Sequence, residues 1–114
     1  MDDKKKNTGL LPPAHPVELE KLIEYSEGSV VSRTLVKNPA GTVTLFSFDA
    51  DQGLSEHTAP YDALIQILDG NVELTIGGEK VHASVGQTVL MPAGIPHAVQ
   101  AAVKCKMLLI MIRG

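Results

Sequence analysis

Two histidines of this 114-residue chain stand where their side chains could take part in chemistry. His97 follows a Pro-Ala-Gly-Ile-Pro turn at 92–96, in which the prolines fix φ and the glycine can adopt a positive φ. His57 lies in a second segment, which ends at Gly70 in the turn of a predicted hairpin. Imidazole is a common transition-metal ligand and a good hydrogen-bonding group. The pair therefore predicts a metal site or a polar anchor for a small ligand.

The composition favours short strands as the elements that position these histidines. Val, Ile and Thr supply 25 residues, and their branched side chains fit a pleated sheet better than a helix. Ten glycines and seven prolines interrupt the sequence at short intervals, as turns between strands do. We expect about nine short strands, and the clearest are 29–36, 42–48, 63–68, 72–76, 80–83, 88–91, 97–102 and 106–112. The last is apolar at nearly every position, so both of its faces should be covered.

The N-terminal part of the chain differs from the strand-rich part. Residues 1–16 hold the lysine run at 4–6 and three prolines, which predicts a flexible tail. Residues 17–25 have a loose apolar stripe of Val17, Leu19, Leu22 and Ile23, which predicts a short helix. No linker or repeat divides the rest, so residues 17–114 should form a single domain.

The composition also argues against several classes of protein. The chain has 10 basic and 13 acidic residues and a net charge of −3, whereas nucleic-acid-binding proteins usually have a basic excess. The single cysteine, Cys105, cannot form an intrachain disulfide, and its place at a strand start predicts a buried, inert thiol. No apolar run has the length of a membrane span, and no apolar leader follows the charged N-terminus. We expect a soluble cytoplasmic protein that binds neither nucleic acid nor membrane.

A spaced motif around His97 shows a family resemblance. The motif is Gly86, five residues, Pro92, one residue, Gly94, two residues and His97. Through this motif, residues 29–112 resemble the cupin superfamily, in particular its small single-domain bacterial and archaeal members. The resemblance implies an all-β fold, the double-stranded β-helix or jelly-roll barrel, with a short N-terminal helix or arm. It also implies a homodimer, paired through a sheet face or an exchanged N-terminal strand.

The first cupin motif is incomplete in this chain. That motif has a His-x-His pair and then a glutamate seven residues before a closing glycine, which is Gly70 here. Its first histidine falls on His57, its second on Ala59 and its glutamate on Ala63. The resemblance thus leaves His57 and His97 as metal ligands, for which Zn, Fe, Ni, Mn or Cu would be suitable ions.

A third metal ligand is the open question in this reading. Catalytic metal sites usually have three protein ligands. Asp62 is a candidate, because it lies one residue from the glutamate position. Strand alternation points Asp62 out of the barrel, unless a bulge near residues 60–61 turns it inward.

Three functions remain open from the sequence. A metal-dependent enzyme acting on a small organic molecule would be an oxygenase, an isomerase or a lyase. A non-catalytic binding protein would use the pocket that the two alanines open, while Tyr61 at the barrel mouth could hydrogen-bond the ligand. The expected lining of that pocket is Ile65, Ile67, Val99 and Met107. An accessory homodimer would need neither a metal nor a ligand.

Overall fold

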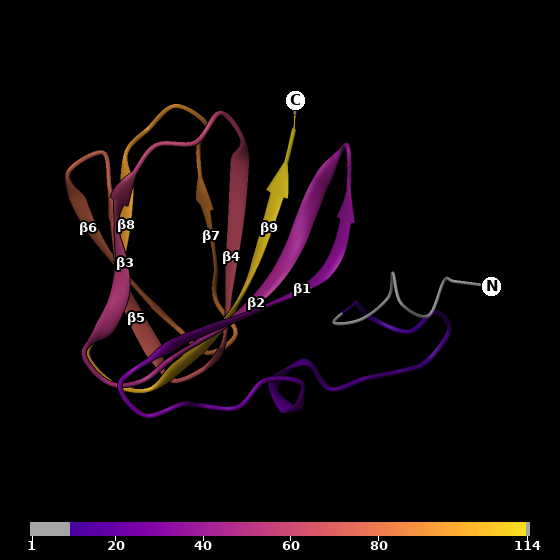
Figure 1. The fold of residues 1–114 in the computed structure, drawn as a ribbon. Coiled ribbons are helices and arrows are strands. Elements are labelled where there is room, and N and C mark those ends of the chain that lie inside the picture. Colours follow the sequence, from indigo (N-terminus) through magenta and orange to yellow (C-terminus); the bar gives the residue numbers. More distant parts are fainter. Residues whose placement is uncertain (1–9, 114) are drawn as a thin grey trace.

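Within residues 10–113, which a computed structural model describes, nine β-strands form two antiparallel sheets (Figure 1). The strands are β1 (Val30–Asn38), β2 (Gly41–Phe48), β3 (Gln52–His57), β4 (Asp62–Asp69), β5 (Asn71–Ile76), β6 (Glu79–Ser84), β7 (Thr88–Met91), β8 (His97–Ala101) and β9 (Cys105–Ile112). The larger sheet has the order β1-β2-β9-β4-β7 and the smaller the order β3-β8-β5-β6. This architecture confirms the expected all-β jelly-roll barrel.

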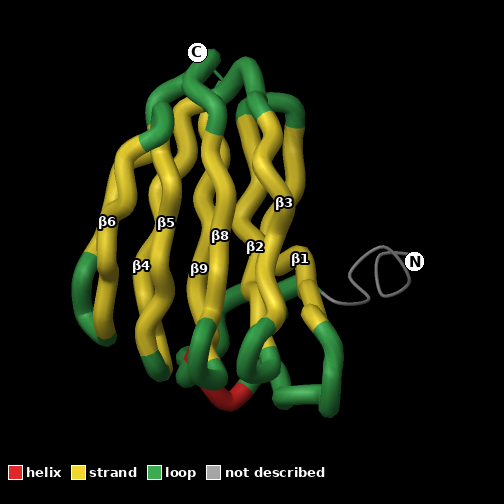
Figure 2. The backbone as a smooth tube through the Cα atoms, turned by 90° about the vertical axis from the view of Figure 1, so that its left-hand side faces the viewer, coloured by secondary structure: helices red, strands yellow, loops and turns green. Residues whose placement is uncertain are grey.

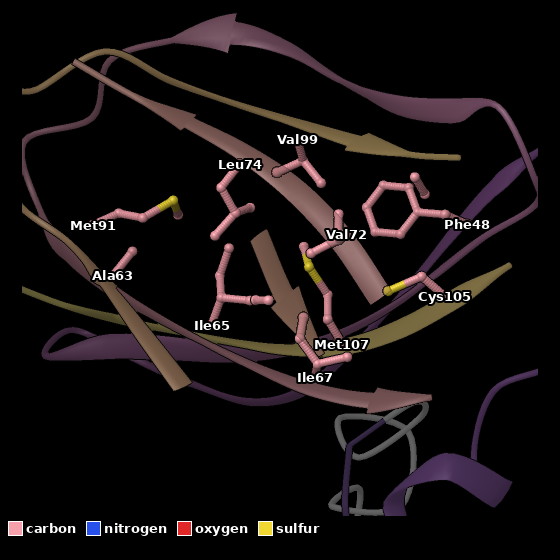
Figure 3. Packing of buried hydrophobic residues seen from close by; sticks show 12 residues of the cluster. Phe48, Ala63, Ile65, Ile67, Val72, Leu74, Met91, Val99, Cys105 and Met107 are labelled. Carbon is pink, nitrogen blue, oxygen red and sulfur yellow. The ribbon is translucent and has the colours of Figure 1, made fainter. Parts of the chain in front are cut away.

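A hydrophobic core fills the space between the two sheets (Figure 3). Strand alternation turns every second residue of β4 into it, so this strand buries Ala63, Ile65 and Ile67. Figure 3 places Ala63 and Met91 at one end of the core and Phe48 at the other. Because the chain has no Trp and only two Phe, aliphatic and Met side chains supply most of this packing.

The sequence pattern misses strand β3. Its six residues contain one large apolar side chain, Leu54, and show no clear alternation. The strand lies at the edge of the smaller sheet and pairs with β8 alone. Gly53 allows the two backbones to approach, because a Cβ there would lie 2.2 Å from the Val99 carbonyl oxygen. An edge strand that is held by backbone contacts needs little apolar patterning, so the sequence gives no signal for it.

The predicted helix at 17–25 is wrong. The structure has only a single 3-10 turn there, η1 (Leu19–Lys21). Side chains from the larger sheet donate to two carbonyl groups near the end of this segment, which a helix over 17–25 would leave without internal partners. Arg33 Nη1 donates to the Leu22 carbonyl at 3.0 Å, and Ser47 Oγ donates to the Glu24 carbonyl at 2.8 Å. The lysine run of the predicted tail lies outside the described residues.

The N-terminal segment covers one end of the outer face of the larger sheet. Ile23 is buried there against Leu35, Leu45 and Leu108. The Leu11 amide donates to the Leu35 carbonyl at 3.0 Å, which fastens the segment to β1. Strand β9 therefore packs against the opposite sheet on one face and against this segment on the other, as its apolar sequence predicts.

An apolar row crosses the other end of the same outer face. The strand registers place one residue from each strand in line: Val36, Val43, Ile110, Leu64 and Leu90. The two at the ends, Val36 and Leu90, are 42% and 53% exposed. Exposed apolar rows of this kind are typical of protein contact surfaces. The homodimer expected from the family resemblance stays a prediction.

Two loops form a rim at the end of the barrel where the C-terminus lies (Figure 1). They join β3 to β4 and β7 to β8, and the Gly94 amide in one donates to the Ala59 carbonyl in the other at 2.9 Å. This rim lies at the opposite end of the barrel from η1 (Figure 2). No helix within residues 10–113 has the length and apolar character needed to cross a membrane.

Candidate functional site

His57 and His97 meet at this rim. His57 is the last residue of β3 and His97 the first of β8, and the two are register partners. Their Nε2 atoms lie 3.0 Å apart, and their rings meet at 72° with centroids 4.3 Å apart. His97 is buried, at 5% exposed, while His57 is open to solvent. The fold thus joins the two predicted histidines, 40 residues apart in sequence, into one polar cluster.

A bulge in β3 decides which side chain faces His97. Leu54 pairs with Val99 and His57 pairs with His97, so β3 advances three residues where β8 advances two. One extra residue reverses the alternation of side chains beyond it. In a regular ladder Glu56 would stand opposite His97. The bulge brings the histidine to this position instead, and Glu56 stays exposed.

The turn before β8 fixes His97 as the sequence predicts. Gly94 adopts a positive φ of 78°. The Gly77 amide donates to the Pro96 carbonyl at 2.8 Å and ties this turn to the hairpin between β5 and β6. Asp62 is involved at the same turn, because its Oδ1 accepts from the Ala93 amide at 2.9 Å. The structure therefore uses Asp62 to hold the rim together and does not bring it to the histidine pair.

The carbonyl contacts of the two imidazoles favour the tautomer that has its hydrogen on Nδ1. His57 Nδ1 lies 2.9 Å from the Ser55 carbonyl oxygen, and His97 Nδ1 lies 3.2 Å from the Ile95 carbonyl oxygen. A carbonyl oxygen only accepts, so each Nδ1 has the hydrogen and each Nε2 has a lone pair. Two lone pairs that face each other at 3.0 Å repel, unless a positive charge lies between them. The pair is thus suited to hold one cation, either a proton or a metal ion.

An apolar pocket opens beside the histidine pair. It has an empty volume of about 350 Å³, including the part open to solvent, and water centres can reach about 30 Å³ of it. A single water needs about 10–15 Å³ by that second measure, so the pocket has room for a few atoms of a ligand as it stands. Among residues 10–113 its lining is Leu54, His57, Ala59, Ala63, Ile65, Met91, His97, Val99, Met107, Leu109 and Met111.

Most of the predicted lining is present, with two exceptions. Ile65, Val99 and Met107 line the pocket, whereas Ile67 is buried in the core and does not reach it. Tyr61 lines a neighbouring pocket, which is described below. The expected lining did not include Met91, Met111, Leu54 and Leu109. Alternation along β9 would have identified Leu109 and Met111 from Met107, whereas the place of Met91 depends on its pairing with Ala63.

The donor set fits a transition metal in part. Histidine ligands of metals usually donate their other ring N–H to a carbonyl or carboxylate, as both histidines do here. Two nitrogen ligands of a tetrahedral metal, at about 2.0–2.1 Å each, lie about 3.3 Å apart, so little movement is required. Among residues 10–113, however, no group of three or more His, Cys, Asp or Glu side chains could hold a metal. The two histidines would supply two ligands to such an ion, and its other positions would be open to water or a bound molecule.

Burial favours the neutral form of His97. Desolvation lowers the pKa of His97 below the 6.5 of a free imidazole. The hydrogen bond to the Ile95 carbonyl opposes this shift, and the nearby His57 adds to it. The neutral form is the one that binds a metal, so the imidazole of His97 remains available as a ligand at lower pH than a free one.

The lowered pKa of His97 predicts an acid-dependent loss of stability. As the pH falls through 6.5, the unfolded state takes up a proton that the folded state does not bind, so the free energy of unfolding falls. Above that pH this contribution is constant. Urea unfolding between about pH 7.5 and about pH 5.5, with EDTA present, should show a smaller fall for His97→Gln than for the parent. An equal fall in both proteins would contradict the prediction. His82→Gln is the matched control, because His82 is an exposed histidine.

Cys105 takes no part in this site. It is fully buried at the start of β9, and burial raises the pKa of its thiol to about 11. Figure 3 places it near Phe48, at the end of the core away from Ala63. The thiol stays protonated near neutral pH, which confirms the expected buried, inert cysteine.

Comparison with known proteins places this fold among relatives. A family model described as Cupin domain matches residues 44–112. A conserved protein of unknown function from Streptococcus pyogenes is 36% identical, with a TM-score of 0.87 over 91% of each chain. A cupin superfamily protein from Desulfitobacterium hafniense is 31% identical, with a TM-score of 0.85 over 91% of this chain and 95% of its own. A Cupin 2 conserved barrel domain protein from Leptotrichia buccalis is 38% identical, with a TM-score of 0.80 over 82% of this chain and 46% of its own. No match is found among curated proteins.

Proposed function

The chain belongs to the cupin family, and from this premise we propose that it binds a small organic molecule in the barrel pocket, beside a transition metal ion held by His57 and His97. The observation that supports the proposal most directly is the pair of Nε2 lone pairs, which face each other beside an apolar pocket. Such a pair needs a cation, and the pocket offers apolar contact area to a ligand.

The side chains of the pocket would bind and orient the ligand. Among residues 10–113, the two histidines are the only ionisable side chains that line this pocket. The ligand would place its apolar part against the wall of Met91, Met107 and Met111, whose flexible side chains can adapt to its shape. A bound metal would supply Lewis-acid polarisation of a ligand oxygen atom. The polar group of the ligand would therefore lie at the histidines.

A second candidate is binding of a small molecule without a metal. The alanines at positions 59 and 63 favour it, because they stand where the family has two further metal ligands. In this case one proton shared by the two imidazoles would satisfy both Nε2 atoms. The pocket and its apolar walls would be the same. A measurement of the metal content of the purified protein distinguishes the two candidate functions.

Restoring a third ligand should strengthen metal binding. Ala63 is 3% exposed and lines the pocket with both histidines, so Ala63→Glu places a carboxylate among them. We expect the affinity for Zn²⁺ to rise at least about tenfold, since one charge-assisted contact contributes about that much. Without metal, the same buried carboxylate should lower the free energy of unfolding by about 3 kcal/mol. Isothermal titration with Zn²⁺ and urea unfolding measure the two effects.

Ala63→Gln is the matched control for this experiment. It has nearly the same size as Ala63→Glu but no charge, so it should disturb packing without the gain in affinity. Equal Zn²⁺ affinities for Ala63→Glu, Ala63→Gln and the parent would contradict a metal position at the histidine pair.

A further inference from the structure

A second pocket lies near the same rim, on the side of the β1–β2 hairpin. It has an empty volume of about 350 Å³, and water centres can reach about 100 Å³ of it. Its lining combines the tip of the hairpin, the loop before β4 and the end of β9. The residues are Lys37, Asn38, Gly41, Thr42, Tyr61, Met111 and Arg113. Met111 also lines the histidine pocket, so the two pockets share a wall.

The charge of this pocket is positive. Lys37 and Arg113 line it, and none of the Asp and Glu residues between positions 10 and 113 does. Within residues 10–113 neither cation forms an ion pair. The chain as a whole has a net charge of −3, so two cations with no ion-pair partner among the described residues are a local departure from its acidic balance. Such a pocket attracts anions.

Two contacts hold Arg113 in place at this positively charged pocket. The Arg113 guanidinium lies over the ring of Tyr61, 5.1 Å from its centroid. The Arg113 amide donates to the Ala40 carbonyl at 2.9 Å, which ties the end of the chain to the hairpin turn. A guanidinium stacked on an aromatic ring is partly ordered before a ligand arrives. The cost of ordering Arg113 on binding is thereby reduced.

Thr42 leaves an unused hydrogen-bonding group in the lining. Its Oγ1 is buried and has no hydrogen-bond partner within residues 10–113. A buried hydroxyl without a partner costs free energy, and most buried polar groups are paired. An anionic oxygen atom in the pocket would accept a hydrogen bond from this hydroxyl.

We propose that this pocket binds a small molecule through an anionic oxygen group, a carboxylate or a phosphate. Lys37 and Arg113 supply the charge, and Thr42 supplies a directed hydrogen bond. Phosphate and carboxylate both suit a guanidinium and an ammonium, and the pocket has room for either group. The site uses neither histidine, so it stands apart from the function proposed above.

The test is an NMR titration of the full chain with inorganic phosphate and with acetate. Saturable shifts at the amides of Gly41, Thr42 and Met111 are expected, and the probe that binds more tightly identifies the anionic group. Lys37→Ala and Arg113→Ala should each weaken binding by about tenfold or more. The shifts should diminish as salt is raised.

Thr42→Val tests the hydroxyl separately. It keeps the shape of the side chain, so it should weaken anion binding while the anion-free protein stays at least as stable as the parent in urea. Lys80→Ala is the matched control, because it removes an exposed lysine from the other sheet and should leave affinity unchanged. The absence of saturable shifts, or an equal loss of affinity in Lys80→Ala, would overturn the proposal. His57→Ala/His97→Ala should bind the anion normally, whatever becomes of the metal site.

Discussion

Purified without a metal-affinity tag and incubated with Zn, Fe, Ni, Mn or Cu ions in turn, the protein should retain close to one metal ion per chain with at least one of them. The His57→Ala/His97→Ala double variant should retain almost none. The reason is that both Nδ1 atoms are committed to carbonyl oxygens, which leaves two Nε2 lone pairs aimed at one point. Elemental mass spectrometry of the desalted proteins measures the difference.

A matched control separates this site from surface histidines. His82 is exposed, and its Nε2 lies 3.2 Å from Asn71 Oδ1. His82→Ala should leave the metal content unchanged. If the parent retains no metal after incubation with any of the five ions, the metal part of the proposed function fails. Binding of a small molecule by a proton-sharing histidine pair would then be the remaining candidate, to be tested with organic ligands.

Gly70→Ala should destabilise the protein severely. Gly70 turns the chain between β4 and β5 with φ +73°, a conformation that L side chains rarely adopt. A Cβ at this position would also lie 2.0 Å from the Lys104 carbonyl oxygen, a backbone atom that cannot move without shifting the start of β9. Strain and clash together should lower the free energy of unfolding by at least about 3 kcal/mol. Urea unfolding of the two proteins measures the loss.

Gly86→Ala is the control that separates the cost of the left-handed backbone from the cost of the steric clash. Gly86 has a similar φ of +88°, but a Cβ there would meet nothing within 4 Å. This variant should lose about 1–2 kcal/mol, the cost of the left-handed backbone alone. Similar losses in both variants would show that the approach of Lys104 to Gly70 contributes nothing, contrary to the prediction.

Local sequence patterns were sufficient to predict the fold class and to single out the two histidines. Eight strands lie where β-branched runs and turn residues predict them, because apolar alternation and turn chemistry act over a few neighbouring residues. Gly70 and Gly94 adopt the positive φ that their turns require. The turn before His97 also forms where the sequence predicts it. Its two prolines restrict the backbone of residues 92–96 without contacts from the rest of the chain.

Contacts between distant segments decided the rest. The segment at 17–25 forms one 3-10 turn and is tied to the larger sheet by Arg33 and Ser47, which donate to two of its carbonyl groups. The bulge in β3 exists only in its pairing with β8, yet it sets His57 rather than Glu56 against His97. The positive pocket needs the hairpin tip beside Tyr61 and Arg113. None of these follows from neighbours in sequence, because each is fixed by which strands lie side by side.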